Sequence, residues 1–315
     1  MSAARTTHET PPVERRPEFH IFLPQMRMGL DVLIDKARAA DAAGFGGIAL
    51  MDHLAPPMAE DQPMHEAMIT AAWLAAHTDR LAVGHLVLCD ALRHPAVLAK
   101  QAVTIDHASR GRFELGIGWG SVPDELEAYG VGDTAPSARV RRLAESLEVI
   151  TALWGGETVD FEGEFHRVKG ARQLPVPLAR IPLLIGGAGR KTLALVARYA
   201  DWWNLPIYAL ERLEELRPAA GGARVSIQQL VAFVPNEMER AEVTELAGRR
   251  FGIYGNGLVI GDAAQLVDHF TALHDRGVER FYTWFSDFAD PETLAAFGAD
   301  VIETMAPRGG ARPWT

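Results

Sequence analysis

The sequence predicts an α/β fold, namely a (β/α)8 TIM barrel with insertions after strand 4 and before strand 5. Its 315 residues contain eight short apolar runs, each followed by a stretch of helical periodicity. An open doubly wound sheet is the competing architecture, but such sheets usually stop at about five or six strands. Because α/β barrels commonly reach about 250 residues as one domain, we expect residues 18–305 to form a single domain.

The expected strands are the apolar runs, and the expected helices follow them in order. The strands span residues 19–24, 47–51, 81–88, 113–117, 181–185, 201–205, 225–234 and 281–285. The helices cover about 30–43, 65–78, 94–107, 138–154, 190–200, 237–250, 263–276 and 291–304, with a weak helix that ends near 217. In the clearest helix, Val140, Leu143 and Leu147 fall on one stripe. Pro95 suits the first turn of the helix that follows His94.

Three segments stand outside this alternation. Residues 157–168 alternate apolar and polar side chains around Glu162 and Gly163, which predicts a β-hairpin inserted into the barrel. A glycine-rich loop over 252–261 leads to the next helix. Residues 1–17 are polar and proline-containing, so we expect a disordered N-terminal tail, and residues 306–315 are expected to form a C-terminal tail.

The composition excludes several classes of protein. The net charge of −10 argues against nucleic-acid binding, which needs clustered basic surface. The sequence has no apolar run long enough to span a membrane and no secretory signal, so we expect a cytoplasmic protein. Cys89 is the single cysteine, which excludes a disulfide framework and any multi-thiolate metal site. We therefore expect no metal centre, no membrane partner and no nucleic-acid partner.

Candidate site residues follow from the barrel itself, because the chemistry of TIM barrels lies at the carboxyl ends of the strands. The residues just past the expected strands are Gln25, Asp52, His53, Asp90, Trp119, the loop 186–190, Asn204, Gln228, Ser286 and Asp287. Neither an HExxH pair nor a GxSxG turn is present, which argues against zinc proteases and α/β-hydrolases.

The loop Gly186-Gly187-Ala188-Gly189-Arg190 lies between an apolar strand and a helix. Glycines let backbone amides approach a ligand closely, and the helix N-terminus favours a phosphate, to which Arg190 could add a charge-assisted bond. A flexible turn without a ligand is the alternative. The segment Gly116–Gly120 does not fit a dinucleotide fingerprint, because Ser121-Val122-Pro123 interrupts any immediate helix. We interpret it as a barrel strand whose glycines clear space beside a flat ligand.

Asp52 and His53 follow the second expected strand. A carboxylate next to an imidazole at a barrel mouth can hold ring heteroatoms or pass a proton near neutral pH. The alternative is a loop aspartate that caps backbone amides beside a half-exposed histidine. The residues alone leave both interpretations open.

Together these motifs resemble the luciferase-like monooxygenase superfamily over residues 18–305. The segments that carry the resemblance are GFGGIALMDHL (44–54), RLAVGHLVLCDALRHPAVLAKQ (80–101), GRFELGIGWG (111–120), RLAESLEVITALW (142–154) and IPLLIGGAGRKTLALVARYADWWNL (181–205). Each segment alone is weak evidence for the family, but their combination in this order is specific to it. The resemblance implies a (β/α)8 barrel that binds either FMN or the deazaflavin coenzyme F420.

The resemblance also implies roles for particular positions. Asp52 and His53 match a pair that contacts the tricyclic ring in the F420 branch, and Leu86–Val87 matches a bulge, often with a cis non-prolyl peptide, that backs the ring. Gly118 and Trp119 match pocket-lining positions. The phosphate loop corresponds to Gly186, Gly187, Ala188, Gly189 and Arg190. One departure is Ser121, which stands where some F420-dependent dehydrogenases carry a glutamate for proton transfer.

The function expected from this resemblance is F420-dependent hydride transfer to or from a small organic substrate. His53 is the expected proton donor or acceptor, with Asp52 orienting a ring or the imidazole. An FMNH2-dependent monooxygenase is the alternative, and a non-catalytic flavin-binding barrel is a second one. A homodimer is expected, and a separate flavin or F420 reductase is a candidate partner.

Overall fold

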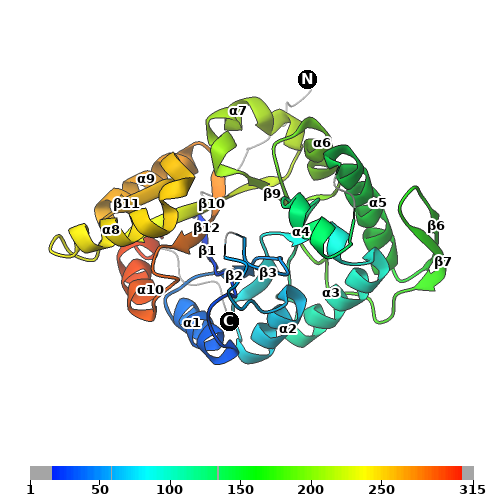
Figure 1. Cartoon of the computed structure of the whole chain (residues 1–315), viewed down its shortest axis with the longest axis horizontal. Helices are drawn as coiled ribbons and strands as arrows, with labels where there is room; N and C mark the ends of the chain where they lie inside the picture. Colours follow the sequence, from blue (N-terminus) through cyan, green and yellow to red (C-terminus); the bar gives the residue numbers. More distant parts are fainter. Residues whose placement is uncertain (1–15, 58, 133–134, 307–315) are drawn as a thin grey trace, which may run out of the picture.

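The computed structural model describes residues 16–57, 59–132 and 135–306. Eight parallel strands form a ring that is surrounded by helices (Figure 1), as the sequence predicts. The ring strands are β1 (Glu18–Phe22), β2 (Gly47–Leu50), β3 (Ala82–His85), β5 (Leu115–Gly118), β8 (Leu183–Gly186), β9 (Trp202–Leu205), β10 (Arg224–Phe233) and β12 (Val278–Phe285). The expected tails, 1–17 and 306–315, lie almost entirely outside the described residues.

The ring closes between β3 and the segment that leads into β5. The Val83 N–H donates to the Arg112 carbonyl at 2.9 Å, and the Glu114 N–H donates to the Val83 carbonyl at 3.0 Å. The short strand β4 (Leu88–Cys89) pairs with β5 beyond this point. The expected strand 81–88 is divided into β3 and β4 by a bulge at Leu86–Val87. The peptide bond between these two residues is cis.

The helices cover the outside of the ring. They are α1 (Leu30–Ala42), α2 (Ala67–His77), α3 (Pro95–Ser109), α5 (Pro136–Trp154), α6 (Arg190–Tyr199), α7 (Leu213–Leu216), α8 (Arg240–Phe251), α9 (Ala263–Asp275) and α10 (Pro291–Phe297). Pro95 occupies the first turn of α3, as predicted. The expected helix 291–304 is shorter, because a π-helical turn continues α10 over Gly298–Ile302. The weak helix before 217 consists of α7 flanked by 3-10 turns over Ile207–Arg212 and Arg217–Ala220.

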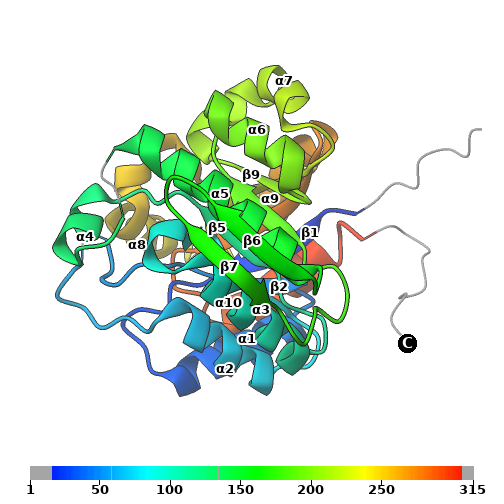
Figure 2. The same cartoon turned by 90° about the vertical axis from the view of Figure 1, so that its right-hand side faces the viewer.

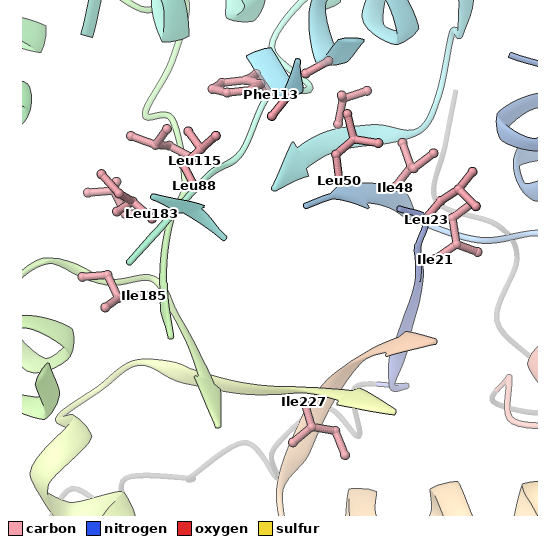
Figure 3. Close-up of a cluster of buried hydrophobic side chains, with 14 of the residues drawn as sticks. Ile21, Leu23, Ile48, Leu50, Leu88, Phe113, Leu115, Leu183, Ile185 and Ile227 are labelled. Carbon is pink, nitrogen blue, oxygen red and sulfur yellow. The ribbon is translucent and has the colours of Figure 1, made fainter. Parts of the chain in front are cut away.

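The hydrophobic core lies between the strands and the helices. Strand side chains alternate between two faces, and Ile21, Ile48, Leu183 and Ile185 point outward from the ring (Figure 3). A second cluster fills the inside of the ring, formed by Phe22, Ala49, Leu184, Trp202 and Tyr282. This alternation explains why most of the strand residues are apolar, because both faces of the strands are buried.

The floor of the barrel interior is held by the buried Arg280. Its guanidinium pairs with Glu18 and Glu114, each at 2.6 Å, and lies 3.8 Å from the ring centroid of Trp202. A buried cation needs such partners, because an unpaired charge in this position would be costly. The polar cluster closes the amino-terminal end and leaves the carboxyl-terminal end for the site.

The predicted hairpin is present as β6 (Thr158–Glu162) and β7 (Arg167–Arg172), which pair antiparallel. It lies over α5 on the outside of the barrel (Figure 2). Glu145 on α5 holds its turn by accepting the backbone N–H groups of Glu164, Phe165 and His166 at 2.7, 2.9 and 3.0 Å.

Two elements differ from the sequence-based expectation. Pro123 does not interrupt a helix but begins one, α4 (Pro123–Ala128). The glycine-rich segment before α9 contains the strand β11 (Leu258–Gly261), which pairs with β10 from Leu230 onward. Because β9 pairs only with the first four residues of β10, over Arg224–Ile227, the rest of that edge is free to accept β11.

Candidate active site

A cavity of about 1260 Å³ opens at the carboxyl ends of the ring strands. This exceeds the roughly 300–1,000 Å³ of common small-molecule sites, so it has room for a cofactor and a substrate together. Eight of the predicted site residues line it: Asp52, His53, Leu86, Val87, Gly118, Trp119, Gly186 and Gly187. Ala188, Gly189 and Arg190 do not line it and lie at the start of α6.

The imidazole of His53 is fixed by a carboxylate from another loop. Its Nδ1 lies 2.8 Å from Oε2 of Glu125, which α4 places at the cavity wall. The other oxygen, Oε1, accepts the backbone N–H groups of Leu54 at 2.6 Å and Ala55 at 3.3 Å. Glu125 therefore fastens the β2–α2 loop to α4, and its acceptor oxygen places the proton of the neutral imidazole on Nδ1.

Glu125 is ionised at this position. Partial burial opposes the charge, but the hydrogen bonds from His53 and from the backbone of Leu54 and Ala55 outweigh it and lower the pKa of the carboxyl.

Asp52 is buried and fully engaged within the protein. Arg93 donates to both of its oxygens, at 2.6 Å to Oδ2 and 2.8 Å to Oδ1, and the Cys89 N–H donates to Oδ2 at 2.7 Å. The same guanidinium pairs with Glu66, which caps α2 through the Ile69 N–H. Asp52 thus ties the end of β2 to β4 and α3, while Glu125 rather than Asp52 contacts the imidazole.

The bulge at Leu86–Val87 forms part of the cavity wall, and neighbouring glycines make room for it. A Cβ on Gly118 would lie 2.8 Å from Cγ2 of Val87, and one on Gly116 would lie 1.8 Å from the His85 carbonyl oxygen. Contacts this short would displace the backbone or the Val87 side chain. The glycines of this strand therefore make room for the bulge, and Gly118 also lines the cavity beside it.

The loop after β8 begins inside the cavity and ends at a helix. Gly187 is held by the protein, because its N–H donates to Asn204 at 3.1 Å and its carbonyl accepts from the Trp203 indole at 2.7 Å. The N–H groups of Ala188, Gly189 and Arg190 have no hydrogen-bond partner within the part of the chain that the structure describes. Unpaired amides at a helix N-terminus are suited to bind an anion.

Aromatic side chains form the cavity wall on the β12 side. Trp284 lies 4.9 Å from Phe251, 5.8 Å from Tyr254 and 5.2 Å from Phe22, measured between ring centroids. Its buried indole Nε1 has no hydrogen-bond partner among the described residues. A buried indole N–H ordinarily finds an acceptor, so a ligand acceptor is well placed to satisfy it.

The other candidates at strand ends divide into two groups. The residues Asn204 and Gln228 line the cavity, whereas Gln25, Asp90, Ser286 and Asp287 do not. Gln25 instead holds the end of β2, because its Nε2 donates to the Met51 carbonyl at 2.6 Å. Asp90 is buried 3.5 Å from Arg142, and burial raises its pKa to about 6.

Two residues that shape the site were not singled out from the sequence. Glu125 lies outside the helices and strands predicted from the sequence, although Pro123 followed by acidic residues is a common helix start. Arg93 precedes the predicted helix that follows His94, and its partner Asp52 is 41 positions away. No local pattern in the sequence links these two positions.

The model of the luciferase-like monooxygenase family matches residues 17–228, about two thirds of the chain. The chain belongs to this family. Among characterised relatives, it is 33% identical over 176 residues to the F420-dependent glucose-6-phosphate dehydrogenase of Microbacterium testaceum. That match covers 56% of this chain and 52% of the relative, so the chain spans only about half the length of this dehydrogenase.

Comparison with solved structures confirms the fold. An F420-dependent secondary alcohol dehydrogenase in complex with an F420–acetone adduct has a TM-score of 0.77 at 17% identity, covering 91% of this chain and 98% of that one. EDTA monooxygenase from Chelativorans sp. BNC1 has a TM-score of 0.78 at 16% identity, covering 94% and 95%. The fold is thus shared equally by F420-dependent enzymes and monooxygenases. None of the helices in the described residues is long and apolar enough to cross a membrane.

Proposed function

We propose that this protein is an F420-dependent oxidoreductase that moves a hydride between the deazaflavin and a small organic substrate. The observation that carries the proposal is the His53–Glu125 pair at the wall of a cavity that also contains the Leu86–Val87 bulge and the start of the Gly186–Arg190 loop. Membership of the luciferase-like family and similarity to an F420-dependent dehydrogenase support it.

The residues at the cavity fit such a cofactor. Leu86, Val87, Gly118 and Trp119 would line the ring, and the three unpaired amides after Gly187 would hold the phosphate, with Arg190 at the same helix start. When bound, the deazaflavin supplies the carbon that gives or accepts the hydride.

In this proposal His53 handles the substrate proton. With Nδ1–H donated to Glu125, the neutral imidazole keeps Nε2 as a hydrogen-bond acceptor that can take a proton from a substrate hydroxyl or return one to a carbonyl. Glu125 acts as a positioning residue. Asp52 is also assigned a positioning role, because both of its oxygens already accept bonds from Arg93.

Titration of the purified protein with F420 and with FMN, each oxidised and reduced, tests the proposal. We expect tight binding of F420 and weak or no binding of FMN. Tight FMN binding with none for F420 would contradict the proposal and support an FMNH2-dependent monooxygenase supplied by a separate reductase. A His53→Ala variant with unchanged turnover would refute the catalytic assignment of His53. A wild type that binds the cofactor but turns over no substrate would favour a non-catalytic flavin-binding barrel.

We also propose a homodimer. Ile69 and Trp73 on α2 and Val97 on α3 are 68%, 41% and 53% exposed, and the two helices are neighbours on the barrel. Analytical ultracentrifugation of the wild type and of a Trp73→Glu variant tests this association, and a monomeric wild type would contradict it.

A further inference from the structure

Four basic side chains line one side of the cavity. Arg27 precedes α1, Lys36 lies on α1, and Arg249 and Arg250 lie at the end of α8. Among the described residues, two carboxylates line the same cavity, and both are engaged, Asp52 by Arg93 and Glu125 by His53. The cavity is therefore more basic than the chain as a whole, which carries a net charge of −10.

Two of these cations follow a strand on the opposite side of the ring from the proposed phosphate loop. Around the ring, β1 is separated from β8 by β2, β3 and β5 in one direction and by β12, β10 and β9 in the other. The loop Gly186–Arg190 follows β8, whereas Arg27 and Lys36 follow β1. The loop after β8 and the side of the cavity that follows β1 can therefore hold two different anionic groups.

The cations are poorly neutralised by the protein. Among the described residues, Arg27, Lys36 and Arg250 form no ion pair, and Arg249 pairs only with the exposed Glu245 at 3.2 Å. Lys36 donates to the Ala289 carbonyl at 2.9 Å, and Arg250 donates to the Ser286 carbonyl. Each of these two groups keeps further N–H donors after that bond.

Burial and nearby charges shift the pKa values of Arg250 and Lys36. Burial lowers the pKa of Arg250, Asp287 opposes this, and Arg249 and Arg27 add to it. Burial likewise lowers the pKa of Lys36, against the opposing effect of Asp290 and Asp287. Like charges that face one another are stabilised by a bound anion.

The adjoining wall is aromatic. Phe251 follows Arg250 in the chain and packs with Tyr254 and Trp284. The Arg250 guanidinium lies 4.9 Å from the ring centroid of Phe288. Apolar surroundings strengthen a charge–charge interaction, because they reduce the local dielectric screening. The wall therefore offers an apolar surface next to a cationic one.

We propose that Arg27, Lys36, Arg249 and Arg250 form an anion subsite that binds the carboxylate or phosphate of an organic substrate, whose apolar body packs on Phe251, Tyr254 and Trp284. This inference rests on the proposed function, since it assigns the opposite wall to the cofactor. The subsite would select anionic substrates and orient them toward His53.

Calorimetric titration of the F420-loaded protein with inorganic phosphate tests the subsite. We expect the Arg27→Gln/Arg250→Gln variant to bind phosphate at least about tenfold more weakly than the wild type, since two charge-assisted bonds are lost. The single Arg27→Gln variant, whose side chain makes no bond to the described residues, should show a smaller loss in the same direction. Arg38→Gln is the matched control, because Arg38 is an exposed cation on α1 outside the cavity.

Three results would overturn the subsite or reassign it. Equal phosphate affinity in the wild type and the double variant would refute it, as would a wild type that binds neither phosphate nor acetate. If the double variant loses affinity for F420 but not for the dephosphorylated deazaflavin, these cations hold the cofactor tail, and the substrate assignment is wrong. If the wild type binds no F420, the proposed function fails, but the same titration of the cofactor-free protein still decides the subsite. In that titration Arg190→Gln is included to weaken phosphate binding at the loop after β8.

Discussion

His53 and Glu125 are 72 positions apart in the sequence, and their side chains meet at 2.8 Å between Nδ1 and Oε2. One follows β2 and the other lies on α4, which follows β5. The carboxylate also binds two backbone amides of the histidine loop, so the imidazole is held in position and in one tautomer. This contact joins two loops of the cavity into one rigid wall.

Replacing Glu125 with glutamine should slow turnover without weakening cofactor binding. The amide can still accept a hydrogen bond, but it no longer supplies the negative charge, so we expect kcat to fall by about 10- to 100-fold. Nitrogen-15 NMR of the histidine ring should show a mixture of tautomers in the variant. Glu127→Gln on the same helix is the control, because Glu127 is exposed. A variant with wild-type kcat and one tautomer would contradict the role.

The pairing of Asp52 with Arg93 predicts a large loss of stability when the cation is removed. The side chains are 1% and 10% exposed, and Arg93→Met leaves the carboxylate buried without its partner. The free energy of unfolding should fall by about 3–5 kcal/mol. Asp52→Asn in the Arg93→Met background should recover part of this loss. Urea denaturation of the wild type, the two single variants and the double variant measures the coupling between the two residues. Additive changes in the free energy of unfolding would show that they do not couple.

Gly118→Ala should disturb the bulge that lines the cavity. The new methyl would lie 2.8 Å from Cγ2 of Val87, and we expect a loss of about 1–3 kcal/mol in stability together with weaker cofactor binding. Adding Val87→Ala should restore much of the stability and of the cofactor binding, because it removes the Cγ2 atom that the new methyl contacts. Thermal unfolding and fluorescence titration test this, and a double variant no better than Gly118→Ala alone would exclude the clash as the cause.

His85 should make the protein less stable in mild acid. Burial lowers its pKa from 6.5 to about 4, against the opposing effects of Asp52 and the bond to the Ala67 carbonyl. Between pH 6.5 and 4 the unfolded chain binds a proton that the folded protein excludes, so stability falls as the pH falls. This histidine should contribute about 3 kcal/mol to that loss. His85→Gln has no such titration, and an equal pH dependence of urea unfolding in both proteins would disprove the assignment.

The sequence predicted the barrel because its signals are local and periodic. Eight apolar runs, each followed by a helix with an apolar face, appear in the order of the strands around the ring. The alternation of apolar and polar residues around Glu162 and Gly163 predicts the hairpin. The sequence did not predict the strand β11, because its formation depends on the free edge of β10 rather than on its own glycine-rich sequence. The cis bond at Leu86–Val87 came from family resemblance, not from residue preferences.

The sequence by itself determined the fold, the family and the position of Asp52, His53 and the Gly186–Arg190 loop at the mouth of the barrel. Only the tertiary structure decided which side chains meet there: Glu125 holds His53, Arg93 holds Asp52, and the glycines beside Val87 admit the bulge. The physical reason is that hydrophobic periodicity is encoded by neighbours in the chain. A hydrogen-bonded pair between two loops depends instead on how strands far apart in sequence are arranged around the ring.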